Sequence, residues 1–143
     1  RTSSSAASDV YKRQALSLTT DTSFLTAYAN DFGFEGVFAR QVEALGQPGD
    51  VLLGISTSGN SKNVLAAAKA AKDNQISVIA FTGETGGQMA DFADLLVAIP
   101  SRIIMHIQEC HIALGHAITA RVETLLSEND EVFARDFEFE SEV

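Results

Sequence analysis

Three short, nearly continuous apolar runs constrain the fold of this chain more than any other feature of its sequence. They are Val51–Ile55, Ile76–Phe81 and Leu95–Ile99, and polar residues or proline bound each of them. Runs of this length and composition are typical of strands in a parallel sheet, where helices cover both faces. We therefore expect three parallel strands with both faces buried.

The segments around these runs have helical spacing. Asn63–Lys72 is rich in alanine and lies between the first two runs, Gln88–Phe92 lies between the second and the third, and Ile103–Leu126 follows the last. Strands that alternate with helices through short connections form parallel sheets. The sequence therefore predicts an α/β fold, a three-layer α/β/α sandwich around a doubly wound, flavodoxin-like parallel sheet.

Shorter elements are expected before the first apolar run. Ala15–Thr19 alternates apolar and hydroxyl side chains, which predicts a strand. Thr22–Ala29 and Val37–Leu45 have the spacing of helices, and Asn30–Gly33 between them has the composition of a turn. These elements extend the same domain toward the N-terminus.

Charge and length limit the kinds of partner. The chain has 143 residues, enough for one domain, and a formal net charge of −9. Residues 127–143 hold seven acidic residues and one arginine, so most of that charge lies in an acidic tail. A nucleic-acid surface needs a basic face, so we expect no nucleic-acid partner.

Three units are predicted along the chain. Residues 1–14 are serine-rich and without periodicity, which indicates a disordered or non-native leader. Residues 15–126 form the domain and residues 127–143 the tail. Cys110 is the one cysteine, no secretory pattern opens the chain, and no apolar run approaches the ~20 residues that span a membrane. We expect a cytoplasmic protein without membrane contact.

The segment Ser56-Thr57-Ser58-Gly59-Asn60-Ser61, here called the hydroxyl loop, follows the first predicted strand. Open parallel sheets bind ligands beyond the carboxyl ends of their strands. Hydroxyl groups, backbone N–H groups and the positive end of the next helix can converge there on a phosphate. The alternative is a plain turn with Ser61 as helix cap, and Lys62 can either add a charge or point to solvent. Dinucleotide and Walker fingerprints are absent from the sequence.

The hydroxyl loop belongs to a longer motif. GDVLLGISTSGNSKNV (residues 49–64) resembles the core motif of SIS (sugar isomerase) domains, and the blocks at residues 18–46, 78–101 and 107–116 resemble the phosphoheptose isomerase subfamily. The resemblance implies a sugar-phosphate substrate and the conversion of sedoheptulose 7-phosphate to D-glycero-D-manno-heptose 7-phosphate for lipopolysaccharide synthesis. It also implies a homotetramer for the full-length protein.

The same resemblance assigns roles to residues. It implies that the substrate, mainly its phosphate, contacts Ser56, Thr57, Ser58 and Ser61, and that Asn30 and Asp31 line the site near the sugar. Gln108 and His116 are implied to help hold a zinc ion, with Gln108 also at the substrate and His116 as a catalytic acid or base. In this family a histidine and a glutamate that complete the zinc site precede the region matched here. We therefore expect no isomerase activity from this chain alone.

Helical geometry separates the candidates on the last helix. Ile107, His111 and Leu114 fall on one apolar stripe, which indicates that His111 packs in the core or at an interface. Gln108 and His116 lie off that stripe, about 80° from one another, so both can reach one object beside the helix. Catalytic zinc usually has three protein ligands, so these two residues cannot form a metal site alone.

Two other functions fit the same fold. One is a non-catalytic SIS adaptor, similar to the bacterial protein that associates with the DnaA replication initiator. The other is a sugar-phosphate sensor of the kind fused to transcription regulators. His116 and Ser58 favour the isomerase, because the adaptor is expected to lack the histidine and to carry arginine at the position of Ser58. The lack of a basic DNA-binding segment counts against the sensor.

Overall fold

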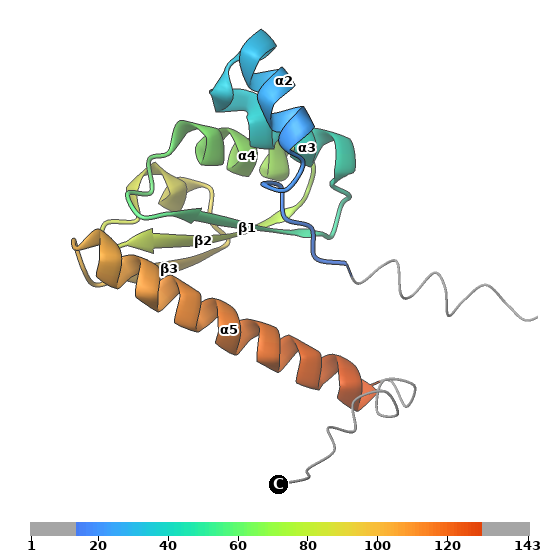
Figure 1. Cartoon of the computed structure of the whole chain (residues 1–143). Coiled ribbons are helices and arrows are strands. Elements are labelled where there is room, and N and C mark those ends of the chain that lie inside the picture. Colours follow the sequence, from blue (N-terminus) through green and yellow to red (C-terminus); the bar gives the residue numbers. More distant parts are fainter. Residues whose placement is uncertain (1–13, 130–143) are drawn as a thin grey trace, which may run out of the picture.

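A parallel sheet forms the centre of the molecule, which a computed structural model describes for residues 14–129. Its strands are β1 (Val51–Ser56), β2 (Ser77–Gly83) and β3 (Leu95–Ile99), in the order β1-β2-β3 (Figure 1). The β1–β2 register runs from Val51↔Ser77 to Ser56↔Thr82, and both strand pairs are parallel. The three predicted strands and their parallel direction are therefore confirmed.

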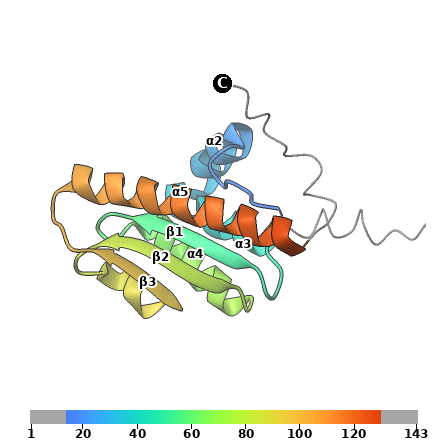
Figure 2. The same ribbon diagram turned by 90° about the horizontal axis from the view of Figure 1, so that it is seen from below.

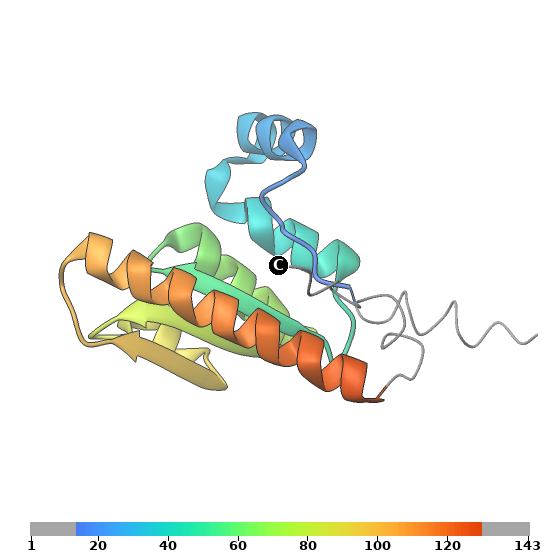
Figure 3. The same ribbon diagram turned by 60° about the horizontal axis from the view of Figure 1, so that its bottom comes forward.

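Helices cover both faces of this sheet. α3 (Val37–Leu45) and α4 (Lys62–Asp73) pack on one face, and α5 (Ile104–Asn129) crosses the other, as Figures 1 and 2 show. α2 (Thr22–Phe32) and the 3₁₀ turn η1 (Phe34–Gly36) lie outside α3 (Figure 3). A second 3₁₀ turn, η2 (Gly87–Asp91), stands where a short helix was expected. This arrangement confirms the α/β class and its three layers.

The core lies between the sheet and the pair α3 and α4. Small side chains on α4 allow its backbone to approach the strands closely, which gives the dense packing of a protein interior. The buried cluster consists of Val42, Ala67, Ala68, Ala70, Ala71, Ile76 and Val78. This packing holds the first turn of α4 at the carboxyl end of β1.

The expectation that every strand is buried on both faces holds for β2 and is wrong for β1 and β3, since Leu95, Leu96 and Ala98 of β3 are exposed. Val51, Leu53 and Ile55 are 60%, 45% and 53% exposed, whereas Gly54 and Ser56 on the opposite face are buried. The physical reason is the path of α5, which contacts β2 and diverges from the sheet toward its C-terminal end (Figure 1). α5 thus stands away from that face of β1, and these three side chains stay exposed.

The predicted strand at Ala15–Thr19 is also wrong. The hydroxyl groups of this segment bond locally instead of leaving the backbone free to pair. Thr20 Oγ1 donates to the Ser17 carbonyl at 2.9 Å, and the hydroxyls of Ser17 and Thr19 lie 2.8 Å apart. Such side-chain bonds compete with a strand ladder and favour a turn.

Helix ends differ slightly from those predicted. α2 begins after Asp21, whose Oδ1 accepts from the Phe24 N–H at 2.9 Å, and it ends at Gly33, whose φ is +91°. The predicted turn at Asn30–Gly33 is therefore the last turn of α2 and its cap. α5 ends at Asn129, three residues beyond the predicted boundary of the domain.

Parts of the predicted leader and tail lie outside the described residues. This holds for residues 1–13 and 130–143. Within residues 14–129, no helix has the length and apolar character needed to cross a membrane.

Candidate phosphate-binding site

The hydroxyl loop brings three serine side chains together beyond the carboxyl end of β1. The Ser56 Oγ lies 2.9 Å from the Ser61 Oγ and 3.5 Å from the Ser58 Oγ. Ser56 is 5% exposed, Ser61 is half-buried and Ser58 is open to solvent. Ser61 is the N-cap of α4, and its hydroxyl makes no cap hydrogen bond. The Ser61 hydroxyl therefore bonds within the loop and not to the N–H groups of α4, which argues against a plain turn capped by Ser61.

The backbone of the loop is folded tightly on itself. The Gly59 N–H donates to the Ser56 carbonyl at 2.9 Å, and Gly59 has a φ of +65°. The Asn60 side chain donates to the Ser58 carbonyl at 2.8 Å. A residue with a side chain rarely adopts the backbone angle of Gly59. The loop thus depends on glycine at this position.

A second loop, Gly83–Gly87, packs directly against the backbone of the hydroxyl loop. We call it the glycine loop. A Cβ atom on Gly59 would lie 2.0 Å from the Gly86 carbonyl oxygen, and one on Gly87 would lie 2.5 Å from the Ser58 carbonyl oxygen. The Gly83 N–H donates to the Thr57 carbonyl at 2.9 Å. The two backbones are therefore in direct contact, and neither loop can change shape alone.

η2 adds polar contacts to the same place. The Met89 N–H donates to the Gly59 carbonyl and the Gln88 N–H donates to Asn60 Oδ1, both at 3.0 Å. The amide of Asn60 is thus used to fix the loop. The roles of Gly86, Gly87 and Gln88 were not foreseen from the sequence, although the Gly-Gly pair after the second apolar run was the available signal.

Two ion pairs flank the hydroxyl loop. Lys62 Nζ lies 2.7 Å from Glu35 Oε1, and Arg102 pairs with Glu84 of the glycine loop. The hydrogen bond to Glu35 and the charge of that carboxylate raise the pKa of the Lys62 ammonium. The Lys62 side chain is 76% exposed and pairs in solvent with Glu35 of η1, and within the described residues it makes no hydrogen bond to the loop hydroxyls.

Asn30 and Asp31 lie in the last turn of α2, where Asn30 Nδ2 donates to Asp31 Oδ1 at 2.8 Å. Within residues 14–129, no hydrogen bond or ion pair joins them to the hydroxyl loop. The closest link is Glu35 on η1, which follows α2 and reaches α4 through Lys62. Their predicted place near the sugar remains a prediction.

Gln108 and His116 are exposed on α5, and His111 between them is buried. The interpretation of His111 as a packed residue is confirmed: its ring lies against Phe81, with the ring centroids 5.4 Å apart. Within the described residues, no group of three or more His, Cys, Asp or Glu side chains could hold a metal ion. The zinc site predicted at Gln108 and His116 remains a prediction, since two donors do not complete one.

A separate apolar groove of about 790 Å³ lies along the open edge of β1, away from the hydroxyl loop. Gln14–Thr19 form one wall, and α3 together with β1 forms the other. The groove lacks the convergent hydroxyl and N–H groups of the hydroxyl loop. We therefore place the candidate anion site at the loop and not in this groove.

Comparison with known proteins identifies the family of this chain. The family model described as the SIS domain matches residues 2–83. The phosphoheptose isomerase of Roseiflexus sp. (strain RS-1) is 52% identical over 114 residues, which are 80% of this chain and 58% of that protein. The phosphoheptose isomerase of Aquifex aeolicus is 54% identical over 114 residues, with 80% and 60% covered.

Solved structures give the same result. Phosphoheptose isomerase GmhA from Neisseria gonorrhoeae superposes with a TM-score of 0.75 and 51% identity, over 77% of this chain and 61% of that one. A phosphoheptose isomerase from Francisella tularensis gives a TM-score of 0.71 and 41% identity, over 75% and 59%. The chain belongs to the SIS domain family. It spans about three-fifths of the length of the relatives named here.

Proposed function

We propose that this chain supplies the phosphate-binding part of a sugar-phosphate isomerase that converts sedoheptulose 7-phosphate to D-glycero-D-manno-heptose 7-phosphate. The observation that carries the proposal is the convergence of the Ser56, Ser58 and Ser61 hydroxyls where α4 begins. Similarity to phosphoheptose isomerases over about four-fifths of the chain supports the choice of substrate and reaction.

The hydroxyl loop suits a phosphate for three reasons. Its hydroxyl groups can donate to phosphate oxygens, and the first N–H groups of α4 have no helical partner. The helix dipole adds a partial positive charge at the same point, worth about 0.3–1 kcal/mol toward an anion. The glycine loop holds these groups in place before the ligand arrives. Binding energy gained at the phosphate then positions the reacting carbons of the sugar.

His116 is our candidate for the acid–base step. In an aldose–ketose exchange, a base removes the proton next to the carbonyl, an enediol forms, and the proton returns to the neighbouring carbon. Histidine suits this step because its charge changes near neutral pH. Gln108 is two turns of α5 earlier and provides an amide that can hold a substrate hydroxyl. Asn30 and Asp31 complete the proposed sugar-binding side chains.

Zinc is part of the proposal only with ligands from beyond residues 14–129. Gln108 and His116 supply two donors at most, and no group of three or more His, Cys, Asp or Glu among the described residues could hold a metal ion. A zinc ion bound there would polarise the carbonyl oxygen and stabilise its negative charge. We assign none of the steps above to it.

Association into a homotetramer in the cytoplasm, in the service of lipopolysaccharide synthesis, completes the proposal. Support for association comes from apolar side chains on α5 that are 45–60% exposed, namely Ile112, Ile118 and Val122. Gly115 adds room, because a Cβ at this position would meet no atom within 4 Å. Apolar stripes left open on a long helix commonly pack against other helices.

The test is a calorimetric titration of the chain with sedoheptulose 7-phosphate, with free sedoheptulose and with inorganic phosphate. We expect binding of the two phosphate-bearing ligands and none of the free sugar. Ser56→Ala should weaken both about tenfold, the value of one hydrogen bond to a charged group. Ser77→Ala, an exposed serine at the opposite end of the sheet, is the matched control. If Ser56→Ala and Ser77→Ala bind sedoheptulose 7-phosphate with equal affinity, the hydroxyl loop is not the phosphate site.

A further inference from the structure

α5 is attached to the sheet by few side chains. Of its residues from Ile104 to Leu126, Ile107 and His111 are the two that are buried, at 3% and 5% exposed. Ile107 makes an apolar contact, since a Cβ on Gly83 would lie 2.9 Å from its Cδ1. His111, one turn later, makes a polar contact. The position of the helix over the sheet therefore depends strongly on these two residues.

The polar contact has a defined direction. His111 Nε2 lies 3.1 Å from the carbonyl oxygen of Thr82. A carbonyl can only accept, so Nε2 carries the hydrogen and donates it. Thr82 is fully buried, and the Phe81 ring lies beside the imidazole. The donor and acceptor thus meet in a site closed to solvent, where a hydrogen bond is strong.

Thr82 is joined directly to the hydroxyl loop. It is the partner of Ser56 in the β1–β2 register, and the next residue, Gly83, donates its N–H to the Thr57 carbonyl at 2.9 Å. His111 therefore holds α5 to the same piece of backbone that supports the loop. Gln108 lies one turn before His111, and His116 lies five residues after it.

The other ring nitrogen supports a polar role for His111. Its Nδ1 is buried and has no hydrogen-bond partner within the part of the chain that the structure describes. A buried nitrogen without a partner costs about 1–3 kcal/mol, and an apolar side chain of similar volume would fill the space without that cost. Packing alone therefore does not explain a histidine here, whereas the bond to Thr82 does.

We propose that His111 is a positioning residue that fixes the rotation and distance of α5 relative to the hydroxyl loop, so that Gln108 and His116 meet the sugar of a bound sugar phosphate. This inference rests on the proposed function. It predicts that loss of the His111–Thr82 bond affects ligands that reach α5 and spares ligands that fill the loop alone.

The experiment compares two ligands on three variants. Inorganic phosphate occupies the loop only, and sedoheptulose 7-phosphate extends toward α5. His111→Leu removes the donor, and His111→Gln keeps an N–H at the position of Nε2. Ile107→Val is the matched control, because it loosens the neighbouring contact and leaves the hydrogen bond intact.

We expect His111→Leu to raise the Kd of the sugar phosphate about tenfold and His111→Gln to restore most of that affinity, the range of one net hydrogen bond. The Kd of inorganic phosphate should stay within about twofold in all variants. Any of four results would overturn the role of His111. In His111→Leu these are an unchanged affinity for the sugar phosphate or an equal loss of affinity for both ligands. The other two are a failure of His111→Gln to restore affinity and the same loss of affinity in Ile107→Val. A wild-type chain that binds neither ligand would instead refute the proposed function.

A spectroscopic measurement covers the case in which His111→Leu does not fold. In wild-type protein, nitrogen-15 NMR should report a hydrogen on Nε2 of His111. Its resonance and the Gln108 side-chain amide should shift with sedoheptulose 7-phosphate and stay in place with inorganic phosphate. A ring hydrogen on Nδ1 alone, or identical shifts with the two ligands, would contradict the inference.

Discussion

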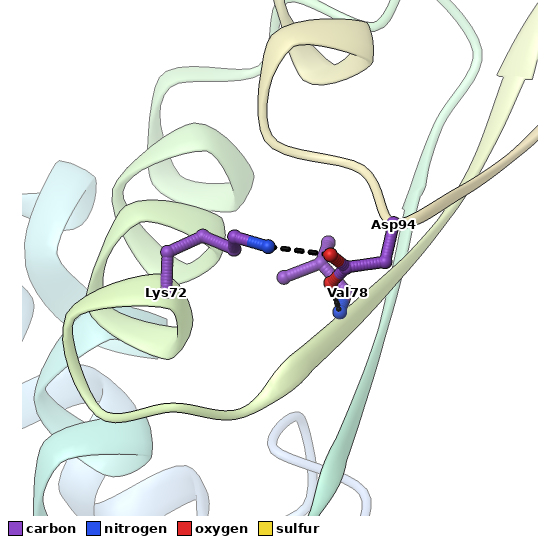
Figure 4. Close-up of polar contacts among 3 residues, drawn as sticks. All are labelled: Lys72, Val78 and Asp94. Atoms are coloured by element: carbon purple, nitrogen blue, oxygen red, sulfur yellow. Dashed lines mark hydrogen bonds and ion pairs between the residues drawn. The ribbon is translucent and has the colours of Figure 1, made fainter.

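Asp94 and Val78 hold each other through two hydrogen bonds at the start of β2 and β3. The Val78 N–H donates to Asp94 Oδ2 at 2.7 Å, and the Asp94 N–H donates to the Val78 carbonyl at 2.8 Å. The other carboxylate oxygen of Asp94 lies 2.5 Å from Lys72 Nζ on α4 (Figure 4). One carboxylate thus joins two strands and the helix that packs on them, at the end of the sheet opposite the hydroxyl loop.

This arrangement makes stability depend on acid pH. The hydrogen bond from Lys72 and that from the Val78 N–H lower the pKa of Asp94 below its ordinary value of 3.8. A carboxyl whose pKa is lowered by folding stabilises the folded state above its unfolded pKa and loses that contribution as the pH falls through its folded pKa. We expect Asp94→Asn to lower the urea midpoint at neutral pH, and the difference from wild type to shrink below pH 3.8.

Two further variants sharpen this test. Asp94→Ala removes the acceptor for Val78 as well as the charge, so it should unfold at lower urea than Asp94→Asn. Asp73→Asn changes an exposed carboxylate at the end of α4 and should leave the midpoint unchanged. If Asp94→Asn and wild type differ equally at pH 7 and at pH 3, the charge of Asp94 is not the cause.

The contact between the two loops predicts a large effect of one methyl group. Gly59→Ala would place Cβ against the Gly86 carbonyl and would also force a left-handed backbone, which alone costs about 1–2 kcal/mol. Urea unfolding should show at least that loss, and phosphate binding should disappear. Ser77→Ala, at an exposed position at the opposite end of the sheet, is the control and should leave stability and phosphate binding unchanged. Phosphate binding by folded Gly59→Ala would contradict the described packing.

The ion pair beside the hydroxyl loop predicts a charge effect on affinity. Glu35→Gln removes a negative charge near the proposed anion and releases the Lys62 ammonium from its ion pair. Phosphate should therefore bind about two- to fivefold more tightly, which is the size of effect that exposed ion pairs have. Lys62→Met should weaken binding by a similar factor. Both effects should fade at 0.5 M salt, because exposed charges are screened. An effect that persists in high salt would indicate a change of loop structure instead.

The side chain of Gln41 holds the segment at residues 14–20 against α3. Its Nε2 donates to the Leu18 and Val37 carbonyls, both at 3.0 Å, and the side chain is 8% exposed. Gln41→Leu should lower the free energy of unfolding in urea by about 0.5–1.5 kcal/mol, because the part-buried Leu18 carbonyl loses its hydrogen-bond donor. Limited proteolysis should then cut within residues 14–20 sooner than in wild type. Gln47→Leu, at an exposed glutamine after α3, should behave as wild type does.

Local sequence patterns were sufficient to predict most of the helices and strands. β3 and α3 have the predicted bounds, because an apolar run and a helical spacing each specify their own structure. The Ala15–Thr19 prediction failed because alternation alone does not distinguish a strand from hydroxyls that bond within their own turn. The predicted burial of both faces of β1 and β3 failed because it depends on where the helices lie over the sheet, which no local pattern encodes.

The hydroxyl loop was predictable and its support was not. Ser56, Ser58 and Ser61 are close in the sequence, so their convergence follows from one turn. The contacts of Gly59 with Gly86, of Asp94 with Val78 and of His111 with Thr82 join residues at least sixteen positions apart. Such contacts depend on strand register and helix placement, which a single sequence leaves open.

The close fit of the glycine loop behind the hydroxyl loop also governs how quickly an anion can enter and leave. Because the glycine loop leaves the serine-bearing backbone no room to move, the proposed binding of a phosphate would need no rearrangement of that backbone and would cost little of its conformational entropy. Association should therefore approach the rate set by diffusion and charge, and a bound phosphate should depart without waiting for a conformational change.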